Sequence, residues 1–209
     1  VFSQQEGIKV IANHIHDALD QVKTLQEMIL EKRLFKGYSG SARIASGSLA
    51  LACSMILQTG LVSPNPWHHL AGWGVVLFIA LIFNYGALSW WFLFDTKVRG
   101  NISMIKPAID ALPPLAVGAG LSLAAIIRGD FNFLFGIWMC CYGLVHCAHR
   151  HSLPKGIYFT GLFYMACGAY CLIAPNINFT SPLPMGVVFF LGELFGGIIL
   201  LRVSGNEEK

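Results

Sequence analysis

The chain has 209 residues, of which 55% are hydrophobic and only 12% are charged. This composition excludes an ordinary soluble domain, which carries about twice that share of charged residues. The formal net charge of +3 comes from cations placed at membrane boundaries, so the lipid bilayer is the predicted partner and no nucleic acid is expected.

An amphipathic cytoplasmic helix is predicted within residues 1–40, ahead of the membrane. Its apolar residues recur at spacings of three and four, as Ile8, Ile11, Ile15, Ala18, Val22, Leu25 and Ile29. This is the seam of a coiled coil, and it predicts a homo-oligomer or docking onto other subunits of a membrane complex. The alternative is packing on the protein's own loops or on the lipid surface, because Leu19 and Met28 broaden the stripe.

Six apolar stretches follow within residues 41–203, each near the ~20 residues that a helix needs to cross the hydrocarbon. They cover residues 44–62, 70–94, 107–127, 131–149, 156–174 and 184–202. They are continuous runs without alternation, so the predicted fold is an all-α, six-helix transmembrane bundle rather than a barrel. Residues 204–209 are predicted to form a polar cytoplasmic tail.

The positions of the cations predict the orientation of these spans. If the N-terminus is cytoplasmic, every Lys and Arg except Arg128 falls on the cytoplasmic side, as the positive-inside rule requires. Both termini are then cytoplasmic, in what we expect to be a bacterial inner membrane. In this interpretation Arg43 is a boundary cation that lies one residue before the first span.

Two stripes of small residues predict close contact between helices. They are Gly47, Ala50 and Ser54 in the first span and Gly136, Cys140, Gly143 and Cys147 in the fourth. All six cysteines lie within predicted spans, so they are expected to pack as small apolar side chains rather than to form disulfides.

Glu193 lies near the middle of the sixth span, where an ionised acid costs roughly 3 kcal/mol. It should therefore face a partner, a cavity or a pathway. Asn84, at a similar depth in the second span, is the expected partner of a protonated Glu193 carboxyl, since no cation is expected at that depth. Asp95 and Asp110, near the ends of the second and third spans, complete the candidate intramembrane polar set.

His146, His149 and His151 form the densest cluster of candidate ligands, at the cytoplasmic end of the fourth span. Residues i and i+3 of one helix, such as His146 and His149, can hold a metal, a haem or a chlorin. Histidines in a last turn also suit the negative end of the helix dipole and an anionic membrane surface. The sequence does not identify a cofactor.

No phosphate loop, nucleophile elbow or H-E-x-x-H motif occurs, and no catalytic residue is predicted. The sequence therefore favours a non-catalytic accessory or structural subunit of a membrane complex or homo-oligomer. One alternative is a small transporter or channel with a polar site around Glu193. The other is a cofactor-binding or metal-binding membrane protein that uses His146 and His149.

Overall fold

The computed structural model describes residues 14–25, 38–94 and 109–207, and the regular elements of these residues are all helices. The chain divides into two units, residues 1–35 and 36–209. In the first unit, residues 14–25 are helical and exposed. Ile15, Val22 and Leu25 of the predicted seam lie on this helix, whereas Ile8, Ile11 and Ile29 lie outside the described residues, so the coiled coil stays a prediction.

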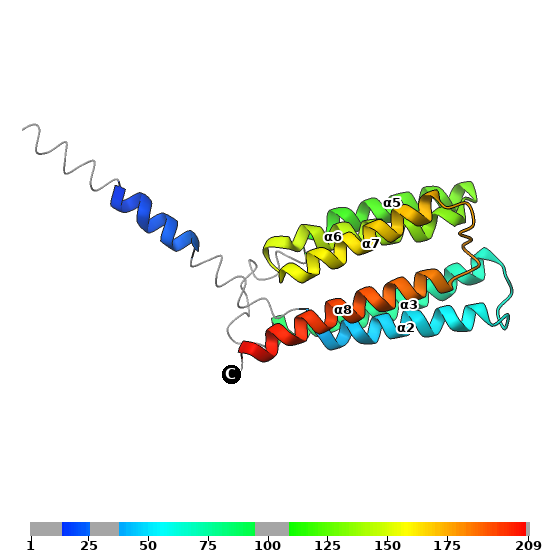
Figure 1. Cartoon of the computed structure of the whole chain (residues 1–209), viewed down its shortest axis with the longest axis horizontal. Helices are drawn as coiled ribbons and strands as arrows, with labels where there is room; N and C mark the ends of the chain where they lie inside the picture. Colours follow the sequence, from blue (N-terminus) through cyan, green and yellow to red (C-terminus); the bar gives the residue numbers. More distant parts are fainter. Residues whose placement is uncertain (1–13, 26–37, 95–108, 208–209) are drawn as a thin grey trace, which may run out of the picture. The chain divides into compact units, whose positions relative to one another are not determined.

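The described part of the second unit contains six longer helices and two 3-10 turns (Figure 1). The helices are α2 (Gly40–Gln58), α3 (Pro66–Phe94), α5 (Leu112–Arg128), α6 (Leu134–Ala148), α7 (Lys155–Ile173) and α8 (Leu183–Glu207). The turns η2 (Phe131–Phe133) and η3 (His149–His151) flank α6. Because α8 continues to Glu207, the predicted polar tail is helical at its start.

Five of these helices, counting η2 with α6, are long and apolar enough to cross a membrane. The prediction of apolar helices compatible with a multi-pass membrane protein is thus confirmed. The third predicted span, residues 107–127, corresponds to α5, which is apolar but has 17 residues. Pro113 and Pro114 lie in its first turn, where proline is tolerated because the first backbone N–H groups have no helical partner. The prolines therefore start this helix late rather than break it.

The helices of the second unit pack in the spatial order α3, α2, α8, α7, α6 and α5. Figure 1 shows α2, α3 and α8 in one group and α5, α6 and α7 in the other. Contacts between α7 and α8 join the two groups. This arrangement brings α2, the first helix of the unit, against α8, the last.

Glycines set the two tightest helix pairs. A Cβ atom added to Gly40 of α2 would lie 2.5 Å from the carbonyl oxygen of Gly197 in α8. In the other group, a Cβ on Gly143 of α6 would lie 2.7 Å from the carbonyl oxygen of Gly161 in α7. Gly47 of the first predicted stripe and Gly136 of the second also leave less than 3.0 Å for a Cβ atom, so both small-residue stripes are packing faces.

The start of α2 differs from the prediction. The helix begins at Gly40, where the Ser39 hydroxyl accepts a hydrogen bond from the Ala42 N–H at 3.3 Å, as serine commonly does at a helix N-cap. Arg43 therefore belongs to the first turn of α2. The predicted start of this span at residue 44 was wrong, because the helix begins four residues earlier.

Candidate functional site

Arg43 projects from the packed face of α2. The buried positions of this helix that face its neighbours recur at spacings of three and four, as Gly40, Arg43, Gly47, Ala50, Ser54 and Leu57. Arg43 as a whole is 4% exposed, although it lies only one turn from the helix end. The α-helical period therefore carries a long cationic side chain into the interior of the bundle.

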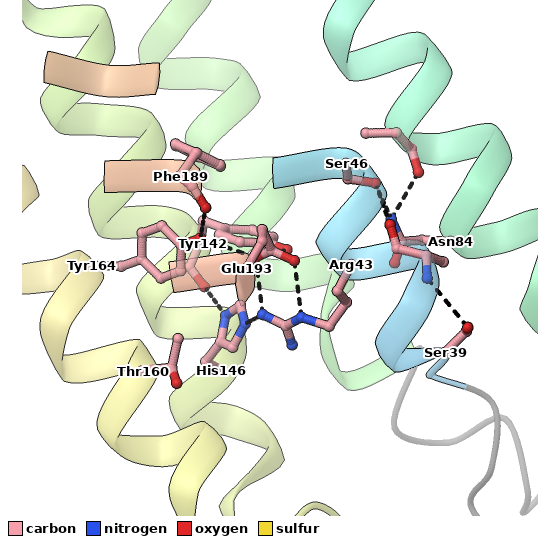
Figure 2. A network of polar contacts seen from close by, with 12 residues as sticks. Ser39, Arg43, Ser46, Asn84, Tyr142, His146, Thr160, Tyr164, Phe189 and Glu193 are labelled. Atoms are coloured by element: carbon pink, nitrogen blue, oxygen red, sulfur yellow. Dashed lines mark hydrogen bonds and ion pairs between the residues drawn. The ribbon is translucent and has the colours of Figure 1, made fainter. Parts of the chain in front are cut away.

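Arg43 forms a two-pronged ion pair with Glu193 of α8 (Figure 2). Its Nε donates to Oε2 at 2.9 Å, and its Nη2 donates to Oε1 at 2.9 Å. Two glycines make room for the pair. A Cβ on Gly47 would lie 2.7 Å from the Glu193 Cβ, and a Cβ on Gly196 would lie 2.9 Å from the Arg43 Cζ. The close crossing of α2 and α8 and the ion pair thus depend on the same glycine positions.

Two tyrosines complete the shell around Glu193. Tyr142 of α6 donates its hydroxyl to Oε1 at 3.0 Å, and Tyr164 of α7 donates to the same oxygen at 2.9 Å. The carboxyl group therefore receives hydrogen bonds from α2, α6 and α7 at once. Because Arg43 is a permanent cation, the site holds a balanced carboxylate, and the expectation that no cation lies at this depth was wrong.

Asn84 does not join Glu193, so the expected partner was wrong. The Asn84 amide donates to the Ser46 Oγ at 3.0 Å and to the Ala80 carbonyl at 2.9 Å. It links α3 to α2 beside the ion pair. Asp110 is exposed two residues before α5, and Asp95 lies outside the described residues.

His146 is held by hydrogen bonds at both ring nitrogens. Its Nδ1 lies 2.8 Å from the Tyr142 carbonyl oxygen, and its Nε2 lies 2.6 Å from the Arg43 Nη2. A neutral ring that donates from Nδ1 and accepts at Nε2 satisfies both contacts. His146 is therefore a structural partner of Arg43 in this geometry, with no nitrogen left for a metal.

Of the other two histidines in the predicted cluster, only His149 has a side chain within the described part of the chain. His149 is buried, with its ring edge-on to Tyr38 at a centroid distance of 5.6 Å. The side chain of His151 lies outside the described part of the chain. Among the described residues no three His, Cys, Asp or Glu side chains come together as a metal site would require.

A cavity of about 660 Å³ reaches this cluster from between α2, α3, α5, α6 and α8. Most of its wall is apolar, including Leu70, Trp73, Leu77, Ala80, Leu115 and Met185. Arg43, Asn84, His146 and Glu193 also line it. Burial raises the pKa of Tyr38, which lies at the same end, so its hydroxyl stays neutral. The cavity therefore has mainly apolar walls and one polar end, which is formed by the hydrogen-bonded side chains of Arg43, His146 and Glu193.

Comparison of the chain with protein-family models, with curated proteins and with solved structures gave no match. The site was partly visible in the sequence, because the stripe through Gly47 and Ala50 continues backward at helical spacing to Arg43. Tyr164 gave no such signal, since its partner Glu193 lies 29 residues away on another helix.

Proposed function

We propose that this chain is a membrane protein with six crossings that binds a small lipid-soluble molecule inside its helical bundle. The observation that carries the proposal is the cavity of about 660 Å³, which has mainly apolar walls and ends on the Arg43–Glu193 pair. Sites for small molecules are typically apolar hollows of about 300–1,000 Å³ with a few fixed polar groups. The proposal places the chain in a bacterial inner membrane, with both termini cytoplasmic.

The site is closest to the transporter alternative, with one difference in the role of Glu193. The Glu193 carboxylate is held by Arg43, Tyr142 and Tyr164, so it is a fixed wall of the binding site. A side chain with this many partners is suited to orient a ligand. It is already fixed, so ligand binding costs it no further conformational entropy.

Quenching of tryptophan fluorescence tests the binding function directly. Trp73 and Trp138 line the cavity, and bromine quenches an indole on contact. Purified protein in lipid nanodiscs is titrated with methyl bromododecanoate. We expect saturable quenching that is lost in the double variant Trp73→Phe/Trp138→Phe, whereas quenching of tryptophans that face lipid should rise linearly with the probe.

A cavity-filling variant supplies the matched comparison. Ala80 lines the cavity, and Ala52 is exposed on α2 outside it. Ala80→Phe should weaken saturable quenching at least about tenfold, the effect of losing about 1.4 kcal/mol, whereas Ala52→Phe should not. Equal quenching by both variants, or linear quenching of the wild type, contradicts the binding function.

A second function, as an accessory subunit or homo-oligomer, is favoured by the helix in residues 14–25. Its apolar residues Ile15, Leu19, Val22 and Leu25 are at least half exposed, a pattern that favours a partner helix. The double variant Val22→Ser/Leu25→Ser should lower the molecular mass of the detergent-solubilised protein by light scattering. Lys23→Ser, on another side of the helix, is the control, and an unchanged mass for both variants contradicts this function.

A further inference from the structure

We infer that the cavity selects an electrically neutral amphiphile whose head group accepts hydrogen bonds, with that head seated at Arg43 and its apolar chain directed toward Trp73. This inference rests on the proposed binding function and names the chemical class of the ligand.

The Arg43 guanidinium has one nitrogen left to offer. Its Nε and Nη2 are used by Glu193 and His146, and no described residue makes a hydrogen bond to Nη1. Figure 2 shows this third nitrogen directed away from Glu193. Arg43 lines the cavity, and its Nη1 carries two N–H donors for which no acceptor is found among the described residues, so we assign these donors to a ligand.

Most other polar groups in the cavity wall are already used by the protein. The Asn84 amide hydrogens go to Ser46 and Ala80, and the Tyr142 hydroxyl goes to Glu193. Ser122 accepts from the Trp138 indole at 2.8 Å while donating to a backbone carbonyl. At the end of the cavity that holds Arg43, the Nη1 donors therefore favour a head group that supplies an acceptor, such as a carbonyl or hydroxyl oxygen.

Charge balance decides against an anionic head. Among the described residues that line the cavity, Arg43 is the one Lys or Arg and Glu193 the one Asp or Glu. Their side chains are 5% and 3% exposed and lie 2.9 Å apart, so the two charges already cancel. A carboxylate or phosphate head adds an uncompensated charge in a region of low dielectric constant, where such a charge is costly. A neutral acceptor gains the Nη1 hydrogen bonds and leaves the balance unchanged.

The apolar part of the cavity fixes the direction of the ligand. Along α3 the lining runs from Leu70 to Leu88, about 27 Å at 1.5 Å per residue. Trp73 and Met185 line the end near the starts of α3 and α8, whereas Arg43 and His149 lie at the opposite end. A ligand with its head at Arg43 therefore extends its chain toward Trp73.

A series of matched probes tests the selectivity in the full-length protein in nanodiscs. The probes are bromododecanamide, bromododecanol, methyl bromododecanoate, bromododecanoate kept ionised at alkaline pH, and bromododecane, which has no head. We expect the three neutral polar probes to bind at least about tenfold more tightly than bromododecanoate or bromododecane, the difference that about 1.4 kcal/mol produces.

Each outcome of this series has a distinct meaning. Tightest binding of bromododecanoate overturns the neutral head while leaving the binding function intact, and so does equal binding of bromododecane and the polar probes. Saturable quenching by none of the probes overturns the binding function itself. The inference is supported only when the neutral polar probes bind most tightly.

The orientation supplies a test that needs no change at Arg43. Methyl bromododecanoate with bromine at the chain end should quench Trp73 more strongly than the isomer with bromine beside the ester. The reverse order overturns the placement of the head.

The variant Arg43→Lys should lose the preference for the ester over bromododecane. The single ammonium nitrogen replaces both hydrogen bonds to Glu193, so the side chain has no separate nitrogen to offer the ligand.

Discussion

The ion pair of Arg43 and Glu193 shows how two charges that are each unfavourable to bury can be buried together. Each charge alone would be expensive at this depth, but the guanidinium fork matches the two carboxylate oxygens at 2.9 Å. Removing one partner leaves the other charge buried and unpaired. The pair is therefore expected to act as a unit, with little tolerance for change at one member only.

The variant Arg43→Leu should lower the free energy of unfolding by about 3–5 kcal/mol, because it strands the Glu193 carboxylate. The double variant Arg43→Leu/Glu193→Leu should recover part of that loss, which gives a coupling energy by double-mutant cycle. Unfolding in mixed micelles, followed by circular dichroism, measures both. Arg202→Leu, at an exposed position of α8, is the control and should change stability by no more than about 0.5 kcal/mol. Additive losses in the double variant contradict the pairing.

The tyrosine shell should have a smaller, separable effect. Tyr164 is fully buried and donates to Glu193, and a hydrogen bond to a charged group contributes about 1.5–3 kcal/mol. Tyr164→Phe should lose about that amount of unfolding free energy. Tyr170→Phe, at a position 62% exposed on the same helix, should lose almost none. Equal losses for the two variants contradict the assigned hydrogen bond.

The crossing of α2 and α8 has little room for side chains. Gly47 packs against Glu193 at this crossing. Gly40 packs against Gly197, which lies about one helical turn after Glu193 on α8. The same small residues that the sequence displayed as a stripe thus set the separation at which Arg43 reaches the carboxylate. A change in this separation should affect both packing and the ion pair.

The variant Gly47→Ala should lose about 1–3 kcal/mol of unfolding free energy, the usual cost of overpacking, since the new Cβ would lie 2.7 Å from the Glu193 Cβ. Gly120→Ala in α5 is the matched control, because a Cβ there meets nothing within 4 Å. This control should be neutral or gain up to about 1 kcal/mol from helix propensity. Thermal unfolding in detergent compares the two, and an equally tolerated Gly47→Ala contradicts the close crossing.

The whole molecule presents one topological question, which is whether α5 crosses the membrane. Its 17 residues span about 26 Å at 1.5 Å per residue, slightly less than the ~30 Å hydrocarbon core. It packs along α6, which favours a crossing. With α5 included, the number of crossings is even and the two termini share one side.

Labelling with a membrane-impermeant maleimide decides between these topologies. We expect the cysteines of Ser41→Cys and Ser204→Cys to react from the same, cytoplasmic side, and those of Ser63→Cys and Ser181→Cys to react from the other. Without a crossing by α5, Ser41 and Ser204 lie on opposite sides. The wild-type protein, whose six cysteines lie in helices, provides the background signal.

The sequence by itself determined the helices, the small-residue stripes and the isolation of Glu193. These features are local, because continuous apolar runs and spacings of three and four fix which residues share a helical face. The same periodicity, continued one turn back from Gly47, reaches Arg43. The predicted boundary at residue 44 hid that continuation, since a cation at the start of a span is ordinarily counted with the loop.

Only the tertiary structure decided which partner Glu193 has. Arg43 lies 150 residues before Glu193 and 103 before His146 in sequence, so no local pattern relates them. Asn84 was favoured by depth alone, and it bonds Ser46 instead. The cavity likewise exists only once α2, α3, α5, α6 and α8 are placed together. Helix packing brings together charges that are each unfavourable alone, and it leaves beside them an apolar space that no single helix encodes.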